Sequence, residues 1–228
     1  MQTGIFILDY LFRDPLTAVF FLIAIIVAVT VHEFAHAFVA SRQGDQTARY
    51  LGRVTLNPAS HLDPAGSFLF LLAGIGWGRP VPVNPYNLKE GKLGDFYVSI
   101  AGIVTNLFTA FIFTLPIQIL AAVGSDITPS ALSENPGLLF ARVMVEVNIL
   151  LAAFNLLPIP PLDGSKAIGI FIPRRFEPAY QEFLRVGPVL LIGIFLLALT
   201  LKLNVLGFII DPIKAVFSFI TFLPTSLR

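Results

Sequence analysis

The sequence predicts an all-α polytopic membrane protein with about five transmembrane helices, a re-entrant segment and a short membrane-associated β-rich segment. Two observations support this fold class. Of the 228 residues, 56% are hydrophobic and only 13% are charged, whereas about one quarter of a soluble domain is charged. Several apolar segments are also long enough to cross a bilayer, which takes about 20 residues. This composition excludes an ordinary soluble protein and makes the lipid bilayer the expected surroundings of the chain.

The first predicted span covers residues 16–40, which are almost continuously apolar. The preceding segment, Gly4 to Phe12, is too short to cross and contains Asp9, so we expect it to lie at the interface. No basic residue precedes Ile5 and no small-residue cleavage site follows a short apolar stretch. We therefore interpret the first long apolar segment as a retained span rather than a signal peptide.

Residues 41–64 contain β-branched residues, Gly and Pro, which favour a short hairpin or re-entrant segment that lies at the membrane surface or packs against protein. Its part from Arg49 to Leu56 could hold an unwound substrate by strand addition. Residues 65–74 are apolar but only half a span long, and Asp63-Pro64 before them is typical of a helix start. We expect this piece to be re-entrant, so that residues 65–76 do not cross the membrane.

Four further spans are expected at residues 95–123, 137–158, 183–201 and 203–222, after a Pro/Gly-rich loop at 75–94. The polar stretches between them are too short to be separate domains. Residues 1–228 are thus predicted to form one membrane-embedded domain, with a core at about 16–170 and C-terminal helices at about 183–222.

Charge in the loops predicts the orientation of these spans. Residues 124–136 contain Asp126 and Glu134 but no Lys or Arg. The three other long polar stretches are basic, through Arg42, Arg49, Arg53, Arg79, Lys89, Lys92, Lys166, Arg174, Arg175 and Arg185. By the positive-inside rule the basic stretches face the cytosol. The formal net charge of +1 gives no indication of a nucleic-acid partner.

The first span carries His32-Glu33-Phe34-Ala35-His36, which has the pattern H-E-x-x-H. Residues four apart lie on one face of a helix, so both imidazoles can bind one Zn²⁺ while Glu33 acts as general base. An alternative is an interhelical hydrogen-bond network. Ionisable groups cost ~2.5–3.5 kcal/mol near the bilayer centre, which favours a function for them.

A third metal ligand must be His, Asp or Glu, because the chain has no Cys. Asp163 is the candidate, directly after the prolines that break the 137–158 span, although Asp163-Gly164 equally fits an ordinary turn. Both the 16–40 and the 137–158 spans run from outside to inside. His32, His36 and Asp163 are therefore expected on the cytosolic side of the membrane.

Five sequence blocks resemble the site-2 protease family of intramembrane metalloproteases, especially its compact prokaryotic branch without a PDZ domain. They are HEFAHAFVASRQGD (32–45), GRVTLNPASHLDPAG (52–66), GWGRPVPVNP (76–85), AGIVTNL (101–107) and FNLLPIPPLDG (154–164). The resemblance implies one catalytic zinc held by His32, His36 and Asp163, with Glu33 as base, and hydrolysis of peptide bonds in or near transmembrane helices. The chain departs from the family at Ile103, where Pro is usual, and at residues 165–166, where Gly-Arg is usual.

Three further polar residues are candidate site residues. Asn106 could stabilise the oxyanion or form an interhelical hydrogen bond, and we weigh these roles equally. Asn155 has the same two possibilities, with orientation of the Asp163 segment favoured. His61 is the remaining histidine, for which we favour a supporting role behind the metal ligands or on the substrate side over that of a fourth ligand. Arg142 and Glu146, four residues apart, are expected to form a structural ion pair.

The predicted function is that of an intramembrane zinc metalloprotease in a prokaryotic cell membrane, with a transmembrane protein as substrate. With no sensor domain in the sequence, recognition would come from the membrane portion or from a regulatory partner. One alternative is a metal-ion transporter, which would need further His, Asp or Glu along other spans. Another is a catalytically inactive binding relative, against which the intact Glu33 argues.

Overall fold

The computed structural model describes residues 13–73, 76–124, 127–201 and 205–220. Within these ranges the chain is mainly helical, and the one strand-like pairing is an isolated antiparallel bridge between Leu62 and Gly78. The α-helices, in chain order, are α2 (Pro15–Arg42), α3 (Thr47–Tyr50), α4 (Pro64–Ala73), α5 (Lys92–Ala122), α6 (Pro129–Glu134), α7 (Pro136–Asn155), α8 (Asp163–Ala167), α9 (Glu177–Leu201) and α10 (Val205–Ile220). Short 3₁₀ turns are η1 (Pro58–Ser60), η2 (Pro85–Asn87), η3 (Ile168–Phe171) and η4 (Arg174–Phe176).

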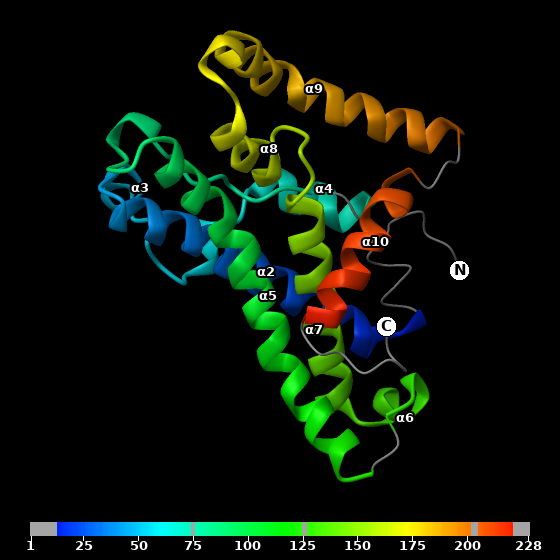
Figure 1. Ribbon diagram of the computed structural model, residues 1–228. Helices are drawn as coiled ribbons and strands as arrows, with labels where there is room; N and C mark the ends of the chain where they lie inside the picture. Colours follow the sequence, from blue (N-terminus) through cyan, green and yellow to red (C-terminus); the bar gives the residue numbers. More distant parts are fainter. Residues whose placement is uncertain (1–12, 74–75, 125–126, 202–204, 221–228) are drawn as a thin grey trace.

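Helices α2, α5 and α7 pack together as the centre of the molecule (Figure 1). In the described part of the chain, these three are long and apolar enough to cross a membrane. They correspond to the spans predicted at residues 16–40, 95–123 and 137–158. The helical fold class is therefore confirmed for this part of the chain, and three of the predicted spans coincide with helices long and apolar enough to cross a membrane.

Small side chains let these helices approach one another closely. Ala24 and Ala28 of α2 are fully buried, and they pack against Val143 and Met144 of α7. Small residues at helix contacts are typical of membrane proteins, where dispersion and hydrogen bonds replace the hydrophobic effect between helices. This close packing also brings polar side chains of the three helices within hydrogen-bond distance at the level of His32.

Helices α9 and α10 occupy the regions predicted as the last two spans. In Figure 1 α9 lies across the end of the bundle above α8, whereas α10 packs beside α7. The Tyr180 hydroxyl of α9 donates to the Ser165 carbonyl of α8 at 2.9 Å. Neither helix is among the three candidate spans found in the described residues, so a total of five spans stays a prediction.

The β-rich segment predicted for residues 41–64 is not present in the structure. These residues instead form the end of α2, helix α3, the turn η1 and connecting turns. The Asp45 carboxylate accepts from both the backbone N–H and the hydroxyl of Thr47, at 3.1 and 2.6 Å, and Asn57 accepts from Ala59 N–H. Such local side-chain bonds compete with strand pairing. No strand is therefore available between residues 49 and 56 for the expected strand addition.

Helix α4 supplies the short apolar segment expected to be re-entrant. It has ten residues, from Pro64 to Ala73, or roughly 15 Å of helix. The predicted helix start is confirmed, because the Asp63 carboxylate accepts from Gly66 N–H at 2.8 Å.

The predicted ion pair between Arg142 and Glu146 is also present, at 2.8 Å. The interfacial segment expected at residues 4–12 lies outside the described residues.

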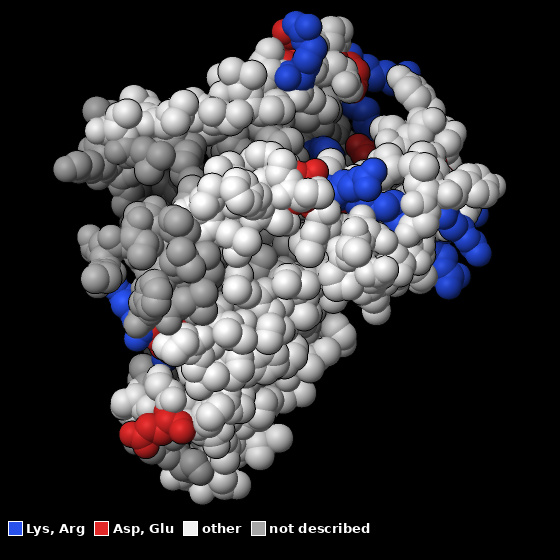
Figure 2. Space-filling model, turned by 180° about the vertical axis from the view of Figure 1, so that it is seen from behind, with Lys and Arg blue, Asp and Glu red and all other residues white. Residues whose placement is uncertain are grey.

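Charged side chains are unevenly distributed over the surface. In Figure 2 much of the blue of Lys and Arg lies toward the end of the molecule that carries α3 and the start of α9. The opposite end, near α6, shows a red patch, and the surface between the two ends is largely white. A broad uncharged band between charged ends is the surface expected of a chain embedded in a bilayer.

Candidate metal centre

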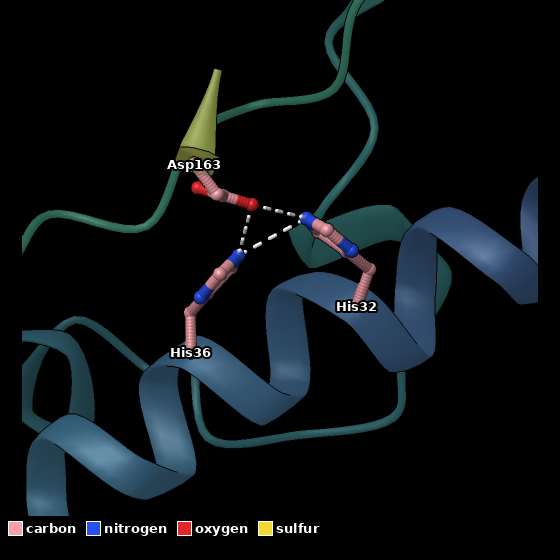
Figure 3. Close-up of side chains that lie close together, drawn as sticks. All are labelled: His32, His36 and Asp163. Atoms are coloured by element: carbon pink, nitrogen blue, oxygen red, sulfur yellow. Dashed lines mark hydrogen bonds and ion pairs between the residues drawn. The ribbon is translucent and has the colours of Figure 1, made fainter. Parts of the chain in front are cut away.

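Helix α2 brings two imidazoles to one side of the bundle core. His32 and His36 are one turn apart, and both are buried, with 5% and 7% of their surface exposed. Their ring centroids lie 4.6 Å apart and their Nε2 atoms 3.0 Å apart. Figure 3 shows both rings pointing from the helix toward Asp163. The i,i+4 spacing thus gives the convergence expected from the sequence.

Asp163 reaches the two imidazoles from the turn that follows the C-terminal end of α7. That helix ends at Asn155, ahead of Pro158, Pro160 and Pro161, which cannot continue it. The chain then folds back on itself. A Cβ on Gly164 would lie 2.1 Å from the Leu156 carbonyl oxygen, so only glycine permits this approach of α8 to the end of α7. The resulting turn buries the Asp163 carboxylate beside α2.

The three side chains form a compact set of donor atoms. Oδ2 of Asp163 lies 3.0 Å from His32 Nε2 and 3.1 Å from His36 Nε2 (Figure 3). In the described residues these are the three side chains that could together hold a metal ion.

Hydrogen bonds on the opposite ring nitrogens fix the histidine tautomers. His36 Nδ1 lies 2.7 Å from the backbone carbonyl oxygen of Val98, which can only accept, so this nitrogen carries the proton. His32 Nδ1 lies 2.7 Å from Oδ1 of Asn106, again an acceptor. Each neutral imidazole therefore presents an unprotonated Nε2 to the cluster, which is the form that binds metals.

This donor set fits a zinc ion. Two nitrogen lone pairs and one carboxylate oxygen converge with no proton between them, an arrangement that a cation stabilises. Tetrahedral zinc with bonds of about 2.0–2.1 Å places its ligands ~3.3 Å apart, close to the three separations observed. Three protein donors without thiolate are also the usual number in catalytic zinc sites.

Asn106 of α5 is fully engaged in holding His32. Its side-chain nitrogen donates to the Ala28 carbonyl at 3.1 Å and to Oδ1 of Asn148 at 2.8 Å. Asn148 in turn donates to the Met144 carbonyl at 2.8 Å. This network fixes which end of the Asn106 amide faces His32. Of the two roles considered from the sequence, the geometry favours the interhelical hydrogen bond.

Glu33 lies beside the donor cluster and is partly exposed. Its Oε2 accepts from the backbone N–H of Val81 at 3.0 Å. The segment that supplies this donor, residues 78–84, is neither helical nor part of a sheet, and it is anchored on both sides: Arg79 N–H donates to the His61 carbonyl at 2.7 Å, and Asn84 N–H to Asp45 Oδ2 at 2.7 Å. The buried Arg53 guanidinium donates to the Arg79 carbonyl.

His61 and Asn155 lie outside the donor cluster. His61 is fully buried; its Nε2 donates to the Thr55 carbonyl at 2.7 Å, and it holds the segment that contacts Glu33 through its own backbone. Asn155 donates to the Leu151 carbonyl of its own helix at 3.0 Å. His61 is thus linked to Glu33 through the segment of Arg79 and Val81, and Asn155 forms a hydrogen bond within α7.

Four positions around the site were not found from the sequence: Val81, Asn148, Val98 and Gly102. Gly102 permits the closest approach, since a Cβ there would lie 2.5 Å from His32 Nδ1. Gly102 lies one turn before Asn106, and residues four apart share a helix face, so the sequence could have indicated that Gly102 also faces the site. Val98 and Val81 contribute only a backbone carbonyl and a backbone N–H, so their side chains could not have indicated these roles.

Residues 20–199 match the model of Peptidase family M50. The chain belongs to this family. The resemblance to site-2 proteases is therefore confirmed. The match covers the HExxH helix, the loop of Asp163 and most of α9.

Several prokaryotic relatives share this region. "Putative zinc metalloprotease YwhC" of Bacillus subtilis is 45% identical over 154 residues, which are 68% of this chain and 69% of that protein. "Putative zinc metalloprotease Rip2" of Mycobacterium tuberculosis H37Rv is 31% identical over 177 residues, 75% of this chain and 64% of that protein. "Putative zinc metalloprotease MJ0611" of Methanocaldococcus jannaschii is 28% identical over 169 residues, 72% and 76% of the two chains. No solved structure matches the chain.

Proposed function

We propose that this M50 protein is an intramembrane zinc metalloprotease that hydrolyses peptide bonds in or near transmembrane segments of other membrane proteins. The observation that carries the proposal is the convergence of His32, His36 and Asp163 beside α5 in the helix bundle. The names of the relatives, each of which includes the words zinc metalloprotease, agree with the chemistry of these donors.

In this proposal His32, His36 and Asp163 hold the zinc, and Asn106 and the Val98 carbonyl keep both imidazoles in the metal-binding tautomer. Bound zinc supplies Lewis-acid chemistry, since it polarises a carbonyl group and makes water more acidic. The three donor side chains are buried among α2, α5 and α8. Burial strengthens the electrostatic interactions that act on the substrate there.

Glu33 is the proposed general base. It follows His32 directly on α2, and its Oε2 is held by Val81 N–H, which leaves Oε1 to take a proton from the attacking water. The same carboxyl group then donates that proton to the leaving amine. Because Val81 N–H is part of an anchored segment, the carboxylate is held in one orientation before substrate binds, which lowers the cost of reaching the reactive geometry.

The site is proposed to open toward the cytosol. Asp163 follows the end of α7 that, by the loop charges, faces inward, and basic side chains gather at this end of the molecule (Figure 2). Water would then reach the site from the cytosolic side. A helical substrate would have to unwind locally to expose a peptide bond, because its carbonyls are otherwise bonded within the helix.

The decisive experiment compares wild-type protein with Glu33→Gln in detergent, using a purified transmembrane substrate. Glu33→Gln is expected to retain stoichiometric zinc, because Glu33 is not among the metal donors, and to lose cleavage by at least ~100-fold, the contribution typical of a general base. His36→Ala should lose both zinc and activity. Wild-type cleavage by Glu33→Gln with zinc bound would contradict the base assignment, and a metal-free, active wild-type protein would contradict the whole proposal.

A further inference from the structure

Two hollows adjoin on the surface at Phe38, an apolar one between α2 and α5 and a basic one between the end of α2 and residues 49–54, and we call them together the groove. Its apolar part has a volume of about 340 Å³ and is formed by side chains of both helices: Phe34, Ala35, Phe38, Tyr97, Ala101 and Val104. Its basic part has a volume of about 460 Å³ and is formed where α2 ends: Phe38, Ser41, Arg42, Arg49, Gly52 and Val54. Phe38 lines both parts, so they adjoin at this side chain.

One stripe of α2 produces this change of character. Phe34, Phe38 and Arg42 are spaced four residues apart and therefore lie along one face of the helix. The Phe34 and Phe38 rings are stacked with centroids 5.7 Å apart, and the Arg42 guanidinium lies 5.1 Å above the Phe38 ring. From Phe34 to Arg42 this stripe is roughly 12 Å long. It presents hydrocarbon at one end and positive charge at the other.

Within the described part of the chain, the two arginines of the basic part have no carboxylate partner. Among the residues that the structure describes, neither Arg42 nor Arg49 forms an ion pair, although Lys92, Arg142, Arg185 and Lys214 do. Among the described residues, the contact of Arg42 with the Phe38 ring leaves its guanidinium N–H groups available to a ligand. A guanidinium fork matches the oxygen spacing of a phosphate group.

We propose that this groove binds an anionic phospholipid, with its phosphate between Arg42 and Arg49 and one acyl chain along Phe34, Phe38 and Tyr97. Charge complementarity selects this occupant: a zwitterionic lipid would place its own cation near two arginines, and a transmembrane peptide would leave them unpaired. The basic end also lies at the end of α2, where a lipid headgroup of the same leaflet would be found. The proposal is independent of the protease activity.

The test uses tryptophan fluorescence, because Trp77 is the single Trp of the chain. In a Trp77→Phe background, Tyr97→Trp places one indole in the groove, which we call the groove indole. The full-length protein is reconstituted into phosphatidylcholine vesicles that contain either brominated phosphatidylglycerol or brominated phosphatidylcholine. We expect the brominated phosphatidylglycerol to quench the groove indole more strongly at equal mole fraction. Each arginine should contribute about five-fold to this preference.

The structure provides a matched control site. Arg175 lies over the Phe176 ring at 4.7 Å, as Arg42 lies over Phe38, but these residues line neither part of the groove. Arg42→Gln/Arg49→Gln should abolish the preference of the groove indole for phosphatidylglycerol, whereas Arg174→Gln/Arg175→Gln, with the same loss of charge, should preserve it. In a separate Trp77→Phe protein, Phe176→Trp should show a weaker preference than Tyr97→Trp.

Four results would overturn the proposal. These are equal quenching of the groove indole by the two lipids, a preference that survives Arg42→Gln/Arg49→Gln, an equal preference at Phe176→Trp, and the absence of quenching by either lipid. The third would indicate general surface attraction, and the last would mean that protein covers the groove. Elution of each variant as a single symmetrical species in detergent checks that it is folded.

Discussion

The backbone N–H of Val81 donates to Oε2 of Glu33 at 3.0 Å, and this bond joins two segments 48 residues apart in the sequence. The donor belongs to the run Pro80-Val81-Pro82, in which it is the one residue with an N–H group. The bond thus gives the proposed catalytic carboxylate a fixed partner that survives any change of the Val81 side chain except to proline. It also makes the orientation of Glu33 depend on a loop outside the HExxH helix.

Val81→Pro tests this dependence directly. Proline removes the N–H group, and a residue that precedes a proline, as residue 81 precedes Pro82, favours the extended backbone that proline itself can adopt. A hydrogen bond to a charged group contributes ~1.5–3 kcal/mol, so we expect kcat for a transmembrane substrate to fall about 10- to 100-fold with zinc content unchanged. Val81→Ala keeps the N–H group and should retain activity. Equal kcat values for the proline and alanine variants would refute the role of this bond.

Asn106 provides a test that separates its two possible roles. If it positions His32, as its contacts with His32, Ala28 and Asn148 indicate, Asn106→Ala should weaken zinc binding by roughly 10- to 100-fold. If it instead stabilises the oxyanion, zinc affinity should stay the same while kcat falls. Competition with a fluorescent chelator measures the affinity. Asn155→Ala is the control, because Asn155 donates to the Leu151 carbonyl of its own helix and its loss should leave zinc affinity unchanged.

Gly102 should tolerate no side chain, because a Cβ there would lie 2.5 Å from both Cε1 and Nδ1 of His32. We expect Gly102→Ala to displace the imidazole and to reduce the zinc content of purified protein, measured by atomic emission. Gly193→Ala is the matched control in α9, where a Cβ would meet nothing within 4 Å. Full zinc occupancy in Gly102→Ala would mean that α5 can move away from α2 without cost.

The extent to which the sequence predicted this site follows from the range of each interaction. His32 and His36 could be paired because one helical turn fixes their relation, and loop charges assigned Asp163 to the same end of the membrane. The hydrogen bonds that join His32 to Asn106, and Asn106 to Asn148, could not be predicted, since they depend on how α2, α5 and α7 pack. Val81 contributes only a backbone group, so its side chain carries no signal.

The same reasoning explains the incorrect β-rich prediction for residues 41–64. Composition indicated strands, because β-branched residues fit a pleated surface, but β-propensity depends strongly on context. Asp45 instead organises a compact turn: it accepts from Thr47, Asn84 and Asn87. Two of these partners are about 40 residues away, beyond the reach of any local pattern. Tertiary hydrogen bonding thus overrides the local preference.

The Asp45 carboxylate predicts a pH dependence of stability. Burial raises its pKa, but the hydrogen bonds from Thr47, Asn84 and Asn87 outweigh burial and lower it below the usual value. The stabilisation is therefore present above the pKa of the unfolded chain, about 3.9, and is lost as the pH falls through the lower folded value. Asp45→Asn should cost about 1–3 kcal/mol at neutral pH, seen as a lower unfolding temperature in detergent. The difference from wild type should shrink below pH ~4; a constant difference would show that packing, and not charge, is responsible.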